Sequence, residues 1–96
     1  MNFKLLKEMC MLNGTSGDEK QVRDFIISKL PDDCDYTVDP LGNLIVNKKG
    51  EAEPKNKVAL FAHMDEVGFI VTYINDDGFV NVANVGGIDD LSLIHI

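Results

Sequence analysis

The chain has 96 residues, of which 45% are hydrophobic, and this size and composition suit one domain with a modest core. Its 9 basic and 16 acidic residues give a formal net charge of -7 without a basic patch, so we expect neither nucleic acid nor a membrane surface as a partner. Two isolated cysteines, no apolar run near the ~20 residues that span a bilayer, and no signal-peptide pattern predict a cytoplasmic protein with reduced thiols.

Two amphipathic helices are predicted in the first third of the chain. Apolar residues recur at helical spacing over residues 3–12, and Asn13-Gly14 supplies the stop that a helix C-terminus prefers. In the segment SGDE that follows, Ser16 is expected to cap the second helix while Glu19 reaches back to it, as in a capping box. The second helix then continues until Pro31 ends it.

Two hairpins are predicted further along the chain. The pieces YTVD (36–39) and NLIVNK (43–48) flank the turn PLG, whose proline and glycine fit turn backbone angles. The runs 66–74 and 78–85 flank the turn signal NDDG. The last run alternates apolar and polar residues, which predicts a strand with one solvated face.

The stretch KVALFAH (57–63) is apolar throughout its centre instead of alternating. Such a run predicts a strand that is covered on both faces, as in the middle of an α/β sheet. Both predicted helices lie upstream of it, so the chain is too short for the fold that this strand implies. We therefore predict the α/β class, with two helices followed by strands of a mixed sheet.

His63 ends this apolar stretch, and Asp65 and Glu66 follow it. An imidazole is a good ligand for zinc or cobalt, and its other ring nitrogen is usually held by a carboxylate. Because residues i and i+2 of an extended chain point to one side, His63 and Asp65 can form such a pair, whereas Glu66 faces the other way and is expected to be a solvated carboxylate. A zinc site needs three or four protein ligands, so the pattern alone favours a hydrogen-bonded strand end over a metal half-site.

Four motifs, taken in order, resemble the opening quarter of the M42 family of metallo-aminopeptidases, which includes the glutamyl aminopeptidases and chains labelled endoglucanase. The motifs are LNGTSGDEKQVRDFI, DPLGNLIV, AHMDEVGFIV and NVGGID, and the resemblance runs from about residue 5 to residue 89. The order of all four makes the resemblance specific, where any one motif would not.

The resemblance implies a cytosolic hydrolase that removes N-terminal residues from peptides with two divalent metal ions, zinc or cobalt. A water activated by both metals attacks the peptide carbonyl while a glutamate takes up its proton. By similarity, His63 would be a metal ligand and Asp65 the catalytic-site carboxylate that orients its imidazole. The remaining ligands and the glutamate base would lie beyond residue 96, so the 96 residues alone are expected to be inactive. Family members form homo-oligomers built from dimers, often hollow tetrahedral dodecamers.

The family pattern also predicts how the chain is divided. Residues 1–90 would be the N-terminal portion of an α/β catalytic domain and would reach the start of an inserted, β-rich dimerisation domain. Residues 91–96, LSLIHI, instead match the translation of a transposon adapter end that is used in preparing sequencing libraries. We therefore predict that 91–96 is a non-native tail and that His95 is not a ligand.

Two other interpretations stay open at this point. The chain could be a small, non-catalytic α+β binding module in which His63 and Asp65 only hydrogen-bond to each other. Related two-metal hydrolases also include carboxypeptidases and deacylases, although the motif HMDEVGF favours the aminopeptidases. One imidazole suits several metals, so the sequence leaves the metal and the preferred substrate residue undecided.

Overall fold

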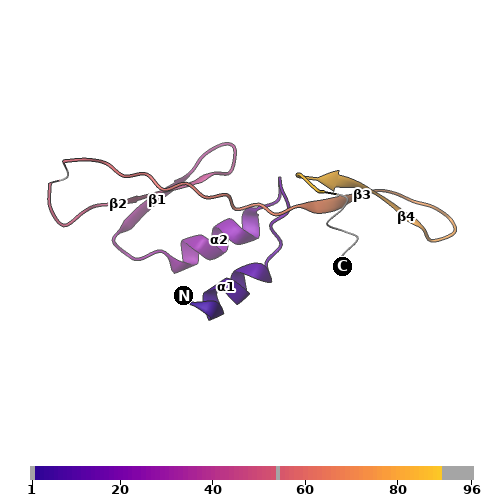
Figure 1. Cartoon of the computed structure of the whole chain (residues 1–96), viewed down its shortest axis with the longest axis horizontal. Helices are drawn as coiled ribbons and strands as arrows, with labels where there is room; N and C mark the ends of the chain where they lie inside the picture. The colour runs from indigo at the N-terminus through magenta and orange to yellow at the C-terminus, as the bar shows by residue number, and fades with distance from the viewer. Residues whose placement is uncertain (1, 54, 90–96) are drawn as a thin grey trace.

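Two helices precede two antiparallel hairpins in the computed structural model, which describes residues 2–53 and 55–89 (Figure 1). The elements are α1 (Phe3–Cys10), α2 (Lys20–Lys29), β1 (Cys34–Val38), β2 (Leu44–Lys48), β3 (Gly68–Ile74) and β4 (Val80–Val85). Strand β1 pairs with β2, and β3 pairs with β4. The predicted helices and hairpins are confirmed. The predicted mixed sheet is wrong for the described residues, whose strands form two separate two-stranded sheets. The segment 91–96, with His95, lies outside the described residues.

The start of α2 differs from the predicted capping box. The helix begins at Lys20 with Glu19 as its N-cap, and the Glu19 carboxylate accepts a hydrogen bond from the Gly17 N–H (2.6 Å). Ser16 does not cap the helix, because its own N–H donates to the Glu66 carbonyl (3.1 Å) and its neighbour Thr15 lies in a β-bridge with Glu66. The helix therefore starts later than the capping box predicts, and its N-cap makes no side-chain hydrogen bond to the first turn.

The turn between β1 and β2 is built around Asp39. Its carboxylate accepts from the backbone N–H groups of Leu41 (2.9 Å) and Asn43 (2.8 Å) and from the Asn43 side-chain amide (2.8 Å). Gly42 takes a φ of +88°, a left-handed conformation that glycine adopts at little cost. The Gly42 carbonyl also accepts from the Arg23 guanidinium (3.0 Å), which ties this hairpin to α2.

The predicted central strand at 57–63 is wrong. Residues 57–64 are extended but belong to no strand, and Val58, Leu60 and Phe61 are 86%, 94% and 93% exposed. A strand that is apolar on both faces needs strand neighbours and covering layers, and the described residues supply neither. The predicted half-solvated strand β4 is likewise uncovered on both faces, because its successive residues 80–84 are all exposed.

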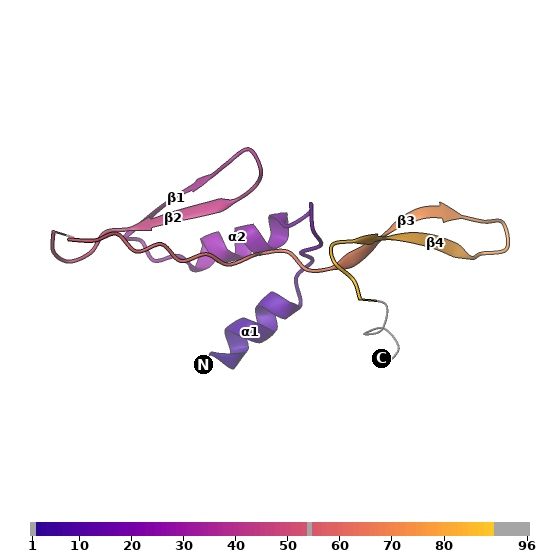
Figure 2. The same cartoon turned by 45° about the horizontal axis from the view of Figure 1, so that its top comes forward.

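The described chain is open and has little core. Its radius of gyration is 18.3 Å, against about 13 Å for a compact domain of this length. Its accessible surface is 8786 Å², against roughly 5,500 Å² for a folded monomer of this mass. Val22 is the buried hydrophobic residue of the described part, and the hairpins extend to opposite ends of the molecule (Figure 2). Within the described ranges, no helix has the length and apolar character needed to cross a bilayer.

Asp39 should make the β1–β2 turn sensitive to acid. The hydrogen bond from the Asn43 side chain, with those from the backbone, lowers the pKa of Asp39 below its ordinary value of 3.8. A lowered folded-state pKa contributes stability that is fully present above pH 3.8 and is lost as the pH falls through the folded pKa. Titration of the Leu41 and Asn43 amide chemical shifts should give a midpoint below 3.8, absent in Asp39→Asn. A midpoint at or above the ordinary value would contradict this assignment.

The open structure also predicts how the 96 residues behave alone. Exposed apolar strands and unpaired strand edges favour association over a cooperative native state. We expect a broad thermal transition by circular dichroism, together with binding of a hydrophobic dye before any heating. A sharp two-state melt of monomeric chain would show instead that the 96 residues are a self-contained module.

Candidate metal half-site

Residues 63–66 form a short extended segment between the exposed apolar stretch and β3. Period-two alternation divides its side chains between two sides of the chain. Met64 and Glu66 help to line a cavity of about 230 Å³ that also involves both helices and the loop between them. The other residues of its lining are Leu6, Met9, Cys10, Leu12, Gly14 and Val22. His63 and Asp65 are not part of this lining, and their side chains are free to form a site of their own.

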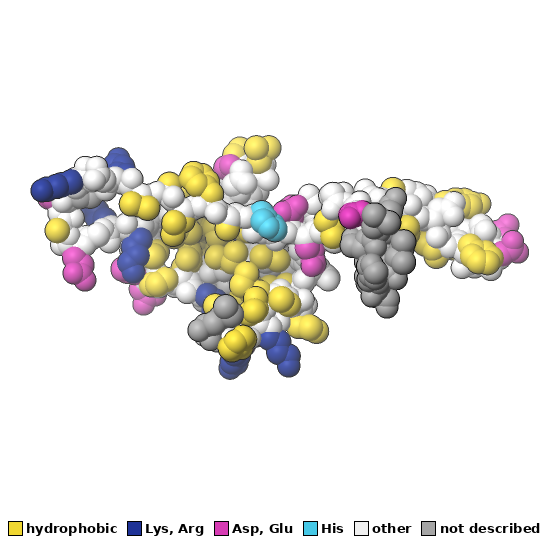
Figure 3. Space-filling view, viewed as in Figure 1, with side chains coloured by type: hydrophobic (Ala, Val, Ile, Leu, Met, Phe, Trp, Pro, Cys, Tyr) yellow, Lys and Arg dark blue, Asp and Glu magenta, His cyan; other side chains and the backbone are white. Residues whose placement is uncertain are grey.

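The structure places the His63 and Asp65 side chains together. The His63 Nδ1 lies 3.2 Å from Asp65 Oδ1 and 3.0 Å from the Asp65 backbone oxygen. Because both neighbours are acceptors, the proton of a neutral imidazole belongs on Nδ1, and the lone pair is on Nε2. The imidazole side chain is 85% exposed, and Figure 3 shows it in cyan at the surface with acidic groups nearby. Among the described residues Nε2 has no hydrogen-bond partner, so this nitrogen is open to solvent.

His63 is a single donor. Among residues 2–53 and 55–89, no three His, Cys, Asp or Glu side chains gather closely enough to hold a metal ion. The carboxylate of Glu66, the nearest further candidate in sequence, is directed to the Gly14 N–H. The donor chemistry of the described residues therefore suits one corner of a metal centre, with an imidazole whose Nδ1 is held by Asp65.

Glu66 fastens this segment to the loop that precedes α2. Its backbone N–H donates to the Gly14 carbonyl (2.7 Å), and its carbonyl accepts from the Ser16 N–H (3.1 Å), which makes a parallel bridge at Thr15. Its side-chain Oε1 accepts from the Gly14 N–H (3.3 Å). Glu66 is exposed, as predicted, but its carboxylate also makes a hydrogen bond that the sequence did not predict. No local pattern could have revealed this role, because the partner lies 52 residues away in the sequence.

Gly14 is buried at this junction, where there is no room for a side chain. A Cβ atom at this position would lie 2.7 Å from Val22 Cγ2 and 3.3 Å from the Met64 carbonyl oxygen. Val22 is itself only 7% exposed and sits on α2, so it has little room to move. The asparagine-glycine pair predicted as a helix stop thus has a second role, since it allows close approach of the segment that carries His63.

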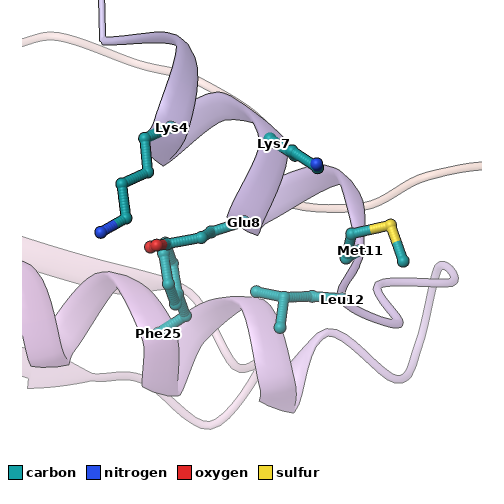
Figure 4. Close-up of a pocket in the computed structure, with 6 residues that line it drawn as sticks. All are labelled: Lys4, Lys7, Glu8, Met11, Leu12 and Phe25. Atoms are coloured by element: carbon teal, nitrogen blue, oxygen red, sulfur yellow. The ribbon is translucent and has the colours of Figure 1, made fainter.

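A second cavity, of about 560 Å³, lies between the two helices and shares Leu12 with the first (Figure 4). It is lined by Lys4, Lys7, Glu8, Met11, Leu12 and Phe25. Glu8 forms an ion pair with Lys29 (3.5 Å), and the Lys29 ammonium lies 5.1 Å from the centre of the Phe25 ring. These contacts join the ends of the helices, and none of the lining residues belongs to the His63–Asp65 pair.

Residues 42–95 match the family model described as M42 glutamyl aminopeptidase. The match includes His63 and Asp65 and extends into the segment 91–96, whose origin stays a prediction. Over 88 residues the chain is 44% identical to FrvX of Escherichia coli (strain K12), which is provisionally named an aminopeptidase, and this covers 91% of the chain and 24% of FrvX.

Two further relatives carry an aminopeptidase name. The chain is 36% identical over 96 residues to the lysyl aminopeptidase of Pyrococcus furiosus, covering 98% of the chain and 27% of that protein. It is 35% identical over 86 residues to the glutamyl aminopeptidase of Lactococcus lactis subsp. cremoris, covering 88% of the chain and 24% of that protein. The chain thus spans about a quarter of the length of these curated relatives.

Replacing Gly14 with alanine should loosen the junction at Glu66. The added Cβ must push apart α2 and the Met64 backbone, and overpacking of this kind costs about 1–3 kcal/mol. Amide hydrogen exchange at Ser16 and Glu66 should therefore accelerate by roughly tenfold. Gly87→Ala is the matched control, because a Cβ at Gly87 has no atom within 4 Å. Equal exchange rates in both variants would contradict the steric role of Gly14.

Proposed function

This chain belongs to the M42 glutamyl aminopeptidase family, and we propose that it is the N-terminal part of a metal-dependent aminopeptidase that hydrolyses N-terminal residues from peptides. The proposal of metal dependence rests on how the two ring nitrogens of His63 are hydrogen-bonded. Its Nδ1 is engaged by Asp65, which leaves Nε2 available at the exposed end of an apolar segment. The peptidase part is supported by the family match and by the names of the relatives.

His63 would bind one of two divalent ions, zinc or cobalt, through Nε2. Asp65 would keep the proton on Nδ1, hold the ring plane and increase the basicity of the ligating nitrogen. When bound, such ions supply Lewis-acid polarisation of the peptide carbonyl and activation of the attacking water. The chain's own contribution is a ligand whose tautomer and orientation are set before the metal arrives. This lowers the cost of ordering the ligand during binding.

The complete protein would supply the other ligands and the base. Within the described residues only His63, paired with Asp65, fits a ligand role, so the 96 residues alone should have no peptidase activity. The large exposed apolar area supports the same proposal, because it leaves α1, the 57–63 stretch and both hairpins with surfaces that a remaining catalytic domain would cover. It also argues against the alternative of a self-contained binding module. A cytoplasmic location and a dimer-based homo-oligomer, such as a tetrahedral dodecamer, complete the proposal.

His63→Ala in the complete protein tests the ligand role. Loss of a ligand should weaken metal binding by more than the ~10–100-fold that is typical for loss of a group orienting a ligand. Asp65→Ala should fall within that smaller range. Both affinities are measured by titrating the metal-free protein with zinc in competition with a chromophoric chelator.

Lys57→Ala, in the same exposed segment, serves as the control and should leave the affinity unchanged. In parallel, amino-acid release from short peptides is measured before and after chelation of the wild-type protein. Activity that survives complete metal removal would refute the proposed metal dependence, and tight metal binding by His63→Ala would refute the assigned ligand.

A further inference from the structure

We infer that Glu66 is a positioning residue for the His63–Asp65 pair, acting through the hydrogen bond between its carboxylate and the Gly14 N–H. This inference rests on the proposed function, because the pair is positioned for a metal. It adds a residue that the sequence predicted to be a solvated carboxylate. Three hydrogen bonds join Glu66 to residues 14 and 16, and two of them involve only backbone atoms.

The bridge at Glu66 is the nearest fixed point to the pair. Residues 57–64 belong to no strand or bridge, and the His63 ring nitrogen Nδ1 contacts only its neighbour two residues on, Asp65, among the described hydrogen bonds. The strand β3 begins at Gly68, after the bridge. Where the imidazole lies relative to the helices is therefore set by the attachment at residue 66.

Two anchors of different chemistry hold the helix-facing side of the segment. Met64 contributes apolar contact in the cavity between the helices, and Glu66 contributes the polar contact with the loop. The backbone bonds of the bridge can be made by any residue at position 66. Only a side chain with an acceptor oxygen can also satisfy the buried Gly14 N–H, which would otherwise lose its partner.

The side-chain bond also fixes the direction of the chain at the pair. A bridge of one residue acts as a hinge, because the segment that carries Glu66 can still rotate about the two backbone hydrogen bonds of the bridge. A third hydrogen bond, from the Gly14 N–H to the Glu66 side chain, restrains that rotation. Side chains alternate along an extended segment, so His63 and Asp65 lie on the side opposite to Met64 and Glu66. The third bond therefore keeps the His63–Asp65 pair facing away from the helices. Metal ligands lose affinity when groups that hold their orientation are removed.

Glu66→Met and Glu66→Gln form a matched pair in the complete protein. Both have nearly the same length, but only glutamine keeps an acceptor oxygen for the Gly14 N–H. We expect the affinity of the metal-free protein for cobalt to fall about tenfold in the methionine variant, the lower end of the range for groups that orient a ligand, and to stay close to wild type in the glutamine variant. The visible spectrum of bound Co²⁺, which reports ligand geometry, should change in the methionine variant alone.

Asp39→Ala is the control for a purely structural effect. It disrupts the β1–β2 turn without touching residues 14–16 or 63–66, so it should lower stability and leave both cobalt readouts unchanged. If Glu66→Met does not fold, Glu66→Ala, which is smaller and also lacks the acceptor, replaces it. Circular dichroism confirms folding at the temperature of the titration.

The outcomes separate the two proposals. A wild-type protein that binds no cobalt refutes the proposed function and, with it, this inference. A wild-type protein that binds cobalt, together with a folded Glu66→Met protein of equal affinity and unchanged spectrum, overturns the positioning role alone. Equal losses in the methionine and glutamine variants would also overturn it, because they would show that the charge or packing at residue 66 matters and the hydrogen bond does not.

Discussion

The bridge between Thr15 and Glu66 is the constraint on which the arrangement of this chain depends. It joins the loop before α2 to the segment that carries the His63–Asp65 pair, and the adjoining hydrogen bond between Gly14 and Glu66 spans 52 residues of sequence. Closing so long a loop costs conformational entropy, and that cost grows only slowly with length, so a few well-placed hydrogen bonds and a close backbone contact can offset it. Gly14 allows the close backbone approach, Met64 contributes apolar contact in the cavity, and Glu66 accepts the hydrogen bond from the Gly14 N–H.

Local features of the fold were predictable from the sequence, and features that depend on distant partners were not. The turn around Asp39 and the turn at NDDG follow from residues within a few positions of each other, and both hairpins form where the sequence indicates. The capping pattern at Ser16 has the right residues, yet the backbone there is held by Glu66. A local preference of about 1 kcal/mol is easily overridden by a long-range pairing that fixes the same atoms.

The candidate site shows the same division. The His63–Asp65 contact is local, so period-two geometry alone predicted that the two side chains meet. The same geometry correctly turned Glu66 to the other side, but it gave no information on what lies there. From the sequence, a carboxylate that faces away from a site is predicted to be solvated, because the sequence does not show that the fold brings the Gly14 N–H to Glu66. Sequence reasoning therefore predicted the His63–Asp65 contact and missed the contact between Glu66 and Gly14.

The exposed stretch 57–63 links the uncovered part of the fold to the His63–Asp65 pair. Its run of apolar residues is suited to a strand covered on both faces, and Leu60 and Phe61 are instead almost fully exposed. His63 stands at the carboxyl end of that stretch, which is where open α/β sheets place their ligands. Strand neighbours that covered Leu60 and Phe61 would bring their own carboxyl ends beside His63, and with them further ligands. Burial of the strand and assembly of the metal centre would then be one event, so the free energy of metal binding would also contribute to the stability of the sheet.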